Sequence, residues 1–219
     1  GAPRWRLCLT LRACDRATKY RCPVVLSSDG YLGQMTGRVS LPDHMVKPGL
    51  PAWGVYGDAA HRRNLNTSIE LIEADLEKHN EHINGKYAQM AEAEQRSDHY
   101  MCDDAEWLIV ACNTPARMAK GAVRELRGEG LKVGLFRPVT LWPFPIRDLK
   151  PLLERVRGVL VVESGPGQLE DELRLAISHA GIERPPPIEH LRRMGGMLPQ
   201  QHDIVEKLGG VAAAAGGAA

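Results

Sequence analysis

The stretch that decides the fold of this chain is "GLFRPVTLWPFP", residues 134–145. It begins like a buried strand and then places prolines at positions 138, 143 and 145, each of which removes a backbone hydrogen-bond donor. We therefore expect a strand over residues 132–137, followed by a stiff loop to which the prolines belong. The loop carries Trp142 and Phe144, and rings of that size need burial against their own domain or a neighbouring subunit.

The same alternation of strand and helix extends on both sides of this stretch. Strand patterns are found at 106–112, 132–137, 158–164 and 187–193, and helix patterns at 114–130, 145–156, 167–181 and around 199–208. This order predicts an α/β fold with a mostly parallel sheet and helices on both faces. We expect residues 132–137 in the centre of the sheet, with the loop after them at the edge where parallel sheets carry their functional loops.

The first part of the chain has a different organisation. Residues 11–20 have the pattern of a short amphipathic helix, and "PVVLSS", residues 23–28, that of a buried strand. This α/β half-unit has too little chain before it to form a sheet by itself. Residues 1–48 are therefore expected to be the end of a larger domain.

Residues 49–102 are expected to be an irregular linker followed by a long connecting helix. Thr67 and Glu70 form a capping-box pattern, which predicts a helix start at Thr67, and Asn84-Gly85 is where a kink would fall. The helix would be either a strut between domains or subunits, or an ordinary amphipathic helix on its own core. Its apolar stripe consists of Ile69, Ile72, Leu76, Ile83, Tyr87 and Met90. A domain at 103–208 would follow, with a disordered Ala/Gly tail at 209–219.

Composition narrows the classes of function. Lys and Arg number 28 against 27 acidic residues, which argues against a nucleic acid or an anionic membrane as the main partner. No apolar run approaches a membrane span and the start lacks a signal-peptide pattern, so we expect a cytoplasmic protein. The five cysteines and eight histidines lack the spacing of a metal or iron–sulfur site. We expect no metal on this chain.

One glycine-rich turn raises the question of anion binding. Gly165 and Gly167 lie between a strand and a helix, as in a dinucleotide-binding turn, but Glu170 stands where the third glycine would be. Gly167 and Gln168 are therefore either anion-binding residues or parts of a tight turn. The chain contains no G-x-S-x-G elbow, Walker loop or recognisable nucleophile with its base. We assign no catalytic residue and expect the isolated chain to be inactive.

Five segments carry a family resemblance: "KYRCPVVLSSDGYLGQM", "YGDAAHRRNLNTS", "LIVACNTPARMAKGAVRELRGEGLKVGLFRPVTLWPFP", "VVESGPGQLEDELRLA" and "RRMGGMLP". In this order, over roughly residues 11–208, the chain resembles the α subunit of 2-oxoacid:ferredoxin oxidoreductases. The 2-oxoglutarate and 2-oxoisovalerate enzymes are the most similar. One departure is Cys112-Asn113, where the family more often has glycine-rich sequence.

The resemblance implies an enzyme that decarboxylates a 2-oxoacid on thiamine diphosphate, reduces ferredoxin through iron–sulfur chemistry and transfers the acyl group to coenzyme A. It implies a pyrimidine-binding domain followed by a transketolase C-terminal-like domain in α. The β subunit would hold thiamine diphosphate, Mg and the cluster. The segment with the carboxylate that activates thiamine is not in this sequence, so the chain would contribute subunit interface and cofactor cleft rather than complete catalysis.

The resemblance also suggests site residues. The candidates for the cofactor cleft are Asp29, Gly30, Tyr31 and Gln34, which could equally be a turn that closes a strand. The candidates for the subunit interface are Arg137, Thr140, Trp142 and Phe144. Two alternatives stay open: a stand-alone α/β module that binds a phosphate-bearing ligand such as coenzyme A or a nucleotide at "SGPGQ", and an incompletely folded product.

Overall fold

The computed structural model describes residues 3–41, 49, 51–67 and 69–216. The chain divides into two compact units, Gly1–Gln89 and Met90–Ala219. We describe each unit by itself. The predicted boundaries at residues 48 and 102 remain predictions.

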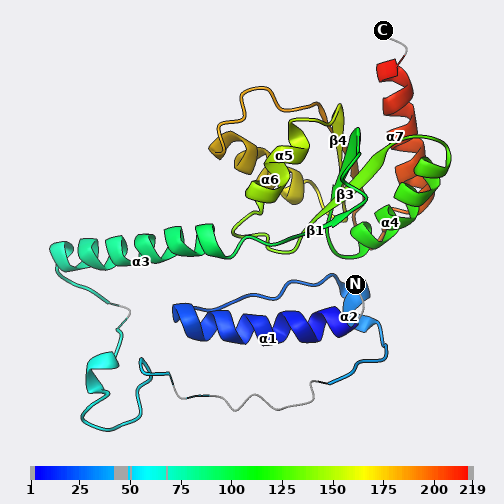
Figure 1. The fold of residues 1–219 in the computed structure, drawn as a ribbon. Helices are drawn as coiled ribbons and strands as arrows, with labels where there is room; N and C mark the ends of the chain where they lie inside the picture. The colour runs from blue at the N-terminus through cyan, green and yellow to red at the C-terminus, as the bar shows by residue number, and fades with distance from the viewer. Residues whose placement is uncertain (1–2, 42–48, 50, 68, 217–219) are drawn as a thin grey trace. The chain divides into compact units, whose positions relative to one another are not determined.

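The second unit is built on a five-stranded sheet. Its strands are β1 (Ser97–Tyr100), β2 (Trp107–Ala111), β3 (Val133–Pro138), β4 (Gly158–Glu163) and β5 (Ile188–Arg192). Their order across the sheet is β1-β3-β2-β4-β5 (Figure 1). All neighbouring pairs are parallel except β1 with β3, so the predicted mostly parallel sheet is confirmed.

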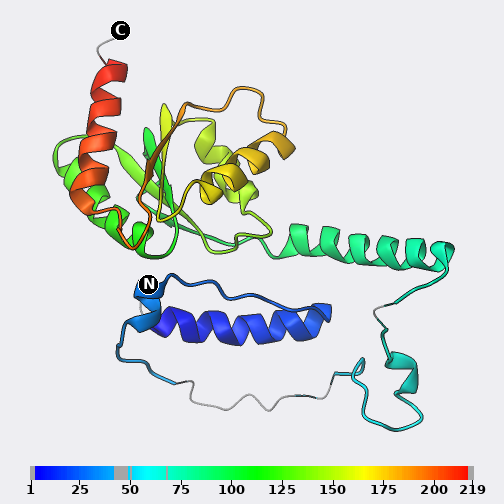
Figure 2. The same cartoon turned by 180° about the vertical axis from the view of Figure 1, so that it is seen from behind.

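Helices cover both faces of this sheet, as expected. Helices α4 (Asn113–Gly128) and α7 (Gln201–Gly216) lie on one face, and α5 (Ile146–Leu153) and α6 (Gln168–His179) lie on the other (Figures 1 and 2). Side chains along β2 and β4 alternate between the two faces of the sheet, and every residue of these strands is buried. The two strands therefore contribute to the core on both faces. Leu108 and Val161 pack toward α5 and α6, whereas Ile109 and Leu160 pack toward α4 and α7.

Three details of the sheet differ from the expectations. Strand β1 was not predicted, because "SDHY" has no apolar alternation; it pairs antiparallel with β3 at the edge, with Ser97 opposite Pro138. Pro138 is therefore the last residue of a strand rather than part of the loop. The middle strand is β2, and β3 is its interior neighbour.

The C-terminal end also differs from the prediction. Residues 209–216, expected to be disordered, continue helix α7, and residues 217–219 lie outside the described part of the chain. Ile204 and Leu208 of α7 are fully buried against the α4 side of the sheet, and Val211 and Ala212 pack onto the same cluster. Packing of the first half of the helix thus supports an alanine-rich second half, since alanine has the highest helix propensity.

The first unit contains helices α1 (Pro3–Tyr20) and α2 (Gly30–Gln34), the 3-10 turn η1 (Arg62–Asn64) and most of helix α3 (Glu73–Ala93), whose last residues belong to the second unit. Helix α1 includes the predicted helix 11–20 and begins eight residues earlier. The predicted strand at 23–28 is wrong for this structure, because no described residue of the unit belongs to a strand. A strand needs a partner, and the unit offers none among its described residues.

Helix α3 begins at Glu73, and the predicted start at Thr67 is wrong. The carbonyl of Ile72 accepts the first helical hydrogen bonds, from the N–H groups of Asp75 and Leu76. The helix runs without interruption through Asn84-Gly85. None of its described residues is buried, and Leu76 and Tyr87 of the apolar stripe are 40% and 44% exposed. The stripe is therefore not buried among the described residues of the chain.

Candidate functional site at the carboxyl edge of the sheet

The second unit has a topological switch point at the carboxyl ends of its strands, between β2 and β4. Strands β2 and β4 are neighbours, but the chain after β2 enters α4 on one face and the chain after β4 leads to α6 on the other face. In open α/β sheets, ligands bind where the connections diverge in this way. The residues after β2 and β4 therefore form the candidate site by position.

The chain after β2 turns sharply into α4. Asn113, the first residue of that helix, has a φ of +52°, a left-handed conformation that Asn adopts more readily than most residues. Thr114 and Ala116, the next residues of the helix on its inner side, are buried. The turn is thus defined by backbone geometry and packing.

The end of β4 carries a buried carboxylate. Glu163 is 6% exposed, and its Oε2 accepts a hydrogen bond of 3.2 Å from the backbone N–H of Leu169 in the first turn of α6. Its Oε1 makes no hydrogen bond within the described part of the chain. An anion on this helix start would meet a negative side chain that already accepts one of the free N–H groups.

Backbone conformation and close packing explain why position 167, in the turn before α6, is a glycine. Gly167 has a φ of +136°, and a Cβ there would lie 3.0 Å from the guanidinium of Arg192. Arg192 in turn donates to Oε2 of Glu170 at 2.6 Å. These contacts favour the tight-turn interpretation of Gly167 and Gln168. Anion binding at these two residues stays an untested prediction.

Glu170 is the most enclosed charge of this region. It is 4% exposed and forms ion pairs with Arg192 and with Arg174, whose guanidinium lies 2.7 Å from Oε1. Burial by itself raises the pKa of Glu170, but the hydrogen bonds from Arg192 and Arg174 outweigh it and hold the pKa below its usual range. The residue that breaks the dinucleotide-binding pattern thus ties α6 to β5.

The four predicted interface residues lie in β3 or in the loop after it, and their environments differ. Arg137 is paired with Asp98 at 3.3 Å, and the Thr140 hydroxyl accepts from the backbone N–H of Arg96 at 3.0 Å. Phe144 is buried in the core beside α5. Trp142, which precedes a cis peptide bond to Pro143, is 56% exposed. Of the four, Trp142 therefore presents the large apolar surface that an interface would use.

The four candidates for the cofactor cleft lie in the first unit. Asp29 is the N-cap of α2 and accepts a hydrogen bond of 2.7 Å from the N–H of Leu32. Gly30, Tyr31 and Gln34 are residues of that short helix, and Tyr31 is 59% exposed. The segment thus closes into one helical turn, and a role in a cleft remains a prediction.

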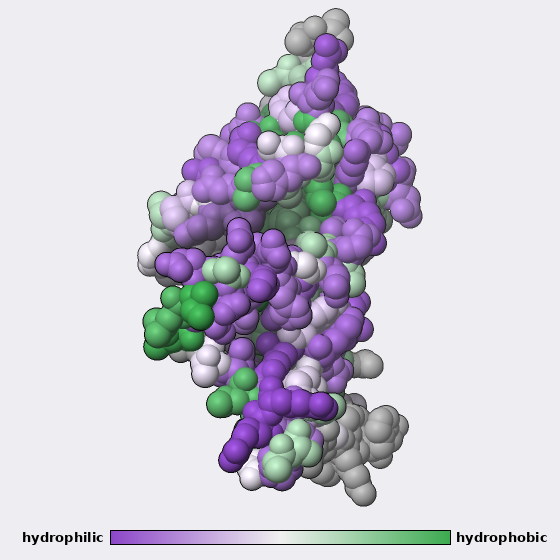
Figure 3. Space-filling model, turned by 90° about the vertical axis from the view of Figure 1, so that its left-hand side faces the viewer, coloured by the Kyte–Doolittle hydropathy of each residue, from purple (hydrophilic) through white to green (hydrophobic). Residues whose placement is uncertain are grey.

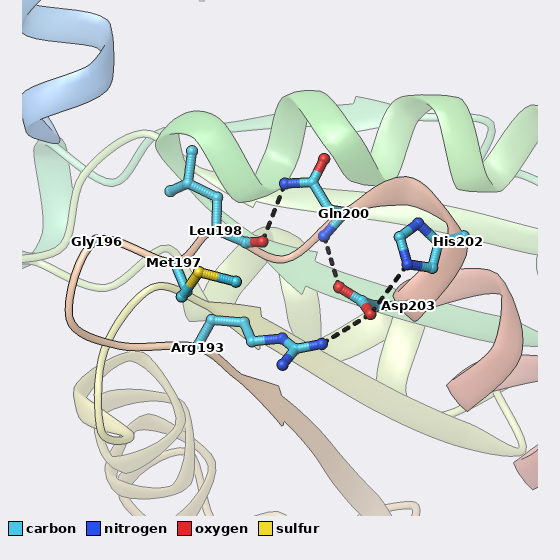
Figure 4. Close-up of a pocket in the computed structure, with 7 residues that line it drawn as sticks. All are labelled: Arg193, Gly196, Met197, Leu198, Gln200, His202 and Asp203. Atoms are coloured by element: carbon cyan, nitrogen blue, oxygen red, sulfur yellow. Dashed lines mark hydrogen bonds and ion pairs between the residues drawn. The ribbon is translucent and has the colours of Figure 1, made fainter.

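A pocket beside the end of β5 was not predicted from the sequence. The pocket has a volume of about 330 Å³ and lies between β5 and the start of α7 (Figure 4). Arg193 crosses it and donates to Asp203 at 2.8 Å, while Asp203 also accepts from the N–H of Gln200. The Gln200 N–H, followed by the Arg193 guanidinium, holds the pKa of Asp203 below its usual range. The sequence signal that could have located this pocket was the "RRMGGMLP" motif, residues 192–199. The other lining residues are Gly196, Met197, Leu198 and His202.

Ligands for a metal do not gather in the described part of the chain. Among those residues, no group of three or more His, Cys, Asp or Glu side chains lies close enough to hold an ion. No disulfide forms among the described cysteines, which are Cys8, Cys14, Cys22, Cys102 and Cys112. No helix among the described residues has the length and apolar character needed to cross a membrane.

Comparison with known proteins shows what the chain is similar to. The family described as "Pyruvate:ferredoxin oxidoreductase core domain II" matches residues 105–204, which contain β2 to β5 and the start of α7. A 2-oxoglutarate:ferredoxin oxidoreductase structure from Magnetococcus marinus aligns with a TM-score of 0.54 and 22% identity, over 64% of this chain and 24% of that one. The second unit thus has the mixed α/β fold of such a core domain.

Two curated relatives match a larger share of the chain than the family does. The chain is 38% identical to ketoisovalerate oxidoreductase subunit VorB of Methanothermobacter thermautotrophicus, over 93% of this chain and 56% of the relative. It is 25% identical to 2-oxoglutarate synthase subunit KorA of Methanothermobacter marburgensis, over 92% of this chain and 60% of the relative. The chain is thus similar to subunits of oxidoreductases that act on 2-oxoacids. The chain spans little more than half the length of the curated relatives it matches.

Proposed function

We propose that this chain is the C-terminal portion of the α subunit of a thiamine-diphosphate-dependent 2-oxoacid:ferredoxin oxidoreductase. The whole enzyme would oxidise and decarboxylate a 2-oxoacid to an acyl-coenzyme A and reduce ferredoxin. The chain would contribute subunit interface and part of the cofactor cleft. The observation that carries the proposal is the 38% identity to a ketoisovalerate oxidoreductase subunit over 93% of the chain.

The cofactors of the reaction would be held by a partner. The described residues offer no metal-ligand group, and their cysteines lack the spacing of a cluster, so the donor set does not fit Mg or an iron–sulfur centre. We therefore place thiamine diphosphate, Mg and the cluster on the β subunit. Ferredoxin and coenzyme A would reach the reaction through the assembled complex, and the isolated chain would be inactive.

Two groups of residues would contribute to the complex, one at the subunit interface and one at the cofactor cleft. The indole of Trp142, exposed on the loop after β3, would pack against the β subunit, while Arg137 and Thr140 keep the base of that loop in place through Asp98 and Arg96. Asp29, Gly30, Tyr31 and Gln34 would form part of the wall of the cofactor cleft. The capped turn of α2 would orient the Tyr31 ring.

The proposal is tested by reconstitution with the cognate β subunit. We expect a stable complex by size-exclusion chromatography with light scattering, and no turnover by the chain alone. The assay combines 2-oxoisovalerate, coenzyme A and methyl viologen, whose reduction replaces that of ferredoxin. Turnover by the chain alone, or failure to associate with β, would contradict the proposal.

The alternative of a stand-alone phosphate-binding module gains no support from the geometry. The first turn of α6 already donates to the carboxylate of Glu163, and Asp171 adds negative charge to the same turn. The charge of Glu170 is paired with Arg174 and Arg192. Titration of the chain with coenzyme A tests this alternative directly. Saturable binding that is lost in Gly167→Glu would revive it.

A further inference from the structure

The pocket between β5 and the start of α7 combines a positive charge with an apolar wall. Arg193, Met197 and Leu198 all line it, and its volume of about 330 Å³ is near the lower limit for small-molecule pockets (Figure 4). Apolar residues also lie among polar ones on the face that Figure 3 draws, so an exposed methionine by itself indicates no site. What distinguishes this pocket is that a guanidinium and apolar side chains line the same hollow.

The guanidinium of Arg193 retains an unused donor group. Its Nη2 donates to Oδ1 of Asp203 at 2.8 Å, and neither Nε nor Nη1 makes a hydrogen bond within the described part of the chain. Nε is buried, whereas the Arg193 side chain as a whole is 42% exposed. Nη1 is therefore the nitrogen of this side chain that can donate to a ligand.

Asp203 orients the guanidinium. Its Oδ1 accepts from Arg193 and its Oδ2 from the backbone N–H of Gln200, so both oxygens are paired, and the side chain is 13% exposed. This carboxylate lies in the first turn of α7, where the positive end of the helix dipole offsets part of its charge. The exposed imidazole of His202, the remaining ionisable group of the lining, adds no negative charge. Arg193 therefore still offers positive charge to a ligand with one negative charge.

The loop that carries the apolar wall has a defined backbone. Gly195 and Gly196 have φ angles of +66° and +88°, and the Met197 N–H donates to the Met194 carbonyl at 3.3 Å. This turn brings exposed Met197 and half-buried Leu198 to the pocket. Methionine adapts its shape to different apolar groups, so the wall suits a short aliphatic chain.

We propose that this pocket binds a short aliphatic carboxylate. The carboxylate accepts a charge-assisted hydrogen bond from Nη1 of Arg193, and the aliphatic chain packs against Met197 and Leu198. The apolar wall favours such a ligand over inorganic phosphate, which has no apolar part to bury. All residues of the site belong to the second unit, so the inference does not rest on the proposed function.

The experiment titrates the 219-residue chain with isovalerate and follows ¹³C-methyl methionine signals by NMR. We expect a saturable shift of the Met197 signal with a dissociation constant on the order of 1 mM, as for a small ligand with one charge-assisted contact. Met101 is the matched control, because it is also exposed and follows β1, whose antiparallel direction places it at the opposite edge of the sheet. Met197→Leu and Met101→Leu assign the two signals.

Two further probes separate the parts of the ligand. The alcohol 3-methyl-1-butanol keeps the carbon skeleton of isovalerate but has no charge, and inorganic phosphate has charge but no aliphatic chain. Each should bind at least about tenfold more weakly than isovalerate. Equal binding of the alcohol would remove Arg193 from the site, and equal binding of phosphate would indicate a general anion site. Either result overturns the proposal.

Substitutions test the residues themselves. Arg193→Leu should weaken isovalerate binding at least about tenfold, whereas Arg184→Leu, a change of an exposed arginine outside the pocket, should leave it unchanged. Met197→Glu places a negative charge in the wall at an exposed position and should weaken binding by a similar factor. Saturation-transfer NMR of isovalerate measures these affinities.

Urea unfolding shows which variants are folded. Because Arg193→Leu also leaves Asp203 without its ion pair, Met197→Glu decides the question if Arg193→Leu does not fold. Unchanged affinity in the folded variants, or no saturable shift of the Met197 signal with isovalerate, would overturn the proposal. Since binding is measured on the chain alone, neither result depends on reconstitution with the β subunit.

Discussion

The carboxylate of Glu163 at the end of β4 accepts a hydrogen bond from the backbone N–H of Leu169, 3.2 Å away in the first turn of α6. The side chain is 6% exposed, so the bond is shielded from water. A strand end and the helix after it are thereby connected by a charged group at the carboxyl edge of the sheet. The same bond uses one of the N–H groups that an anion at the start of α6 would otherwise bind.

We predict that Glu163→Ala lowers the free energy of unfolding of the second unit by about 1–3 kcal/mol. The change leaves a buried N–H group without its acceptor. Urea unfolding measured by far-UV circular dichroism gives the value. Glu183→Ala is the control, because Glu183 is exposed and forms no ion pair within the described part of the chain. Equal stability of the two variants would show that the Glu163 bond adds nothing.

The ion pairs of Glu170 predict a specific dependence on pH. The pKa of Glu170 is lower in the folded chain than in the unfolded chain, where it is about 4.3. The contribution of Glu170 is therefore complete above the unfolded pKa and is lost as the pH falls through the folded pKa. The stability difference between wild type and Glu170→Gln should be constant near pH 7 and shrink below about pH 4.

The measurement compares urea unfolding of both proteins between about pH 7 and about pH 3, a range that spans the titration of a carboxyl group. Glu172→Gln is the matched control, since Glu172 is an exposed residue of the same helix. At neutral pH, Glu170→Gln should cost about 1–3 kcal/mol because Arg192 loses its charged acceptor. A difference that stays constant down to the acidic end of the range would contradict the assigned ion pairs.

Gly167 provides a prediction about backbone geometry. Gly167→Ala should lower stability by about 1–3 kcal/mol, because its φ of +136° strains any residue with a Cβ and because that Cβ approaches Arg192. Gly128→Ala, in a helix with open space around its Cβ, should be neutral or stabilising. Thermal unfolding distinguishes the two. A neutral Gly167→Ala would indicate that the turn adopts another conformation.

Substitutions of Trp142 and Phe144 should distinguish a role in the subunit interface from a role in the core. Phe144→Ala removes a buried ring and should cost about 3–5 kcal/mol of stability. Trp142→Ala should change the stability of the isolated chain by less than about 1 kcal/mol, but weaken binding to the β subunit by at least about tenfold. Urea unfolding and biolayer interferometry measure the two effects. Unchanged affinity in Trp142→Ala would remove this residue from the proposed interface.

Local sequence patterns predicted secondary structure best in the second unit, where strands and helices pack against one another. The strands at Trp107–Ala111 and Gly158–Glu163 are continuous apolar runs, and such runs predict strands buried on both faces. Strand β1 escaped prediction because its residues are polar and its place depends on backbone pairing with β3. Helix α7 continued past residue 208 because the packing of Ile204 and Leu208 stabilises the next turns of the helix.

The loop after β3 was predictable in position but not in detail. The prolines at 143 and 145 located the loop after β3, whereas Pro138 ends the strand. Only packing distinguished buried Phe144 from exposed Trp142. The mismatch of Glu170 with a dinucleotide-binding turn was visible in the sequence. Its pairing with Arg192 was not, because these residues are brought together by two adjacent strands and a helix.

The sequence by itself determined the alternation of strands and helices, because burial on both faces of a parallel sheet demands long apolar runs separated by amphipathic helices. Only the tertiary structure decided which charges meet, where the chain forms an edge strand, and whether Pro23–Ser28 is a strand at all. The physical reason is that ion pairs and ladder hydrogen bonds join residues distant in the chain. Their formation depends on the partner that folding provides.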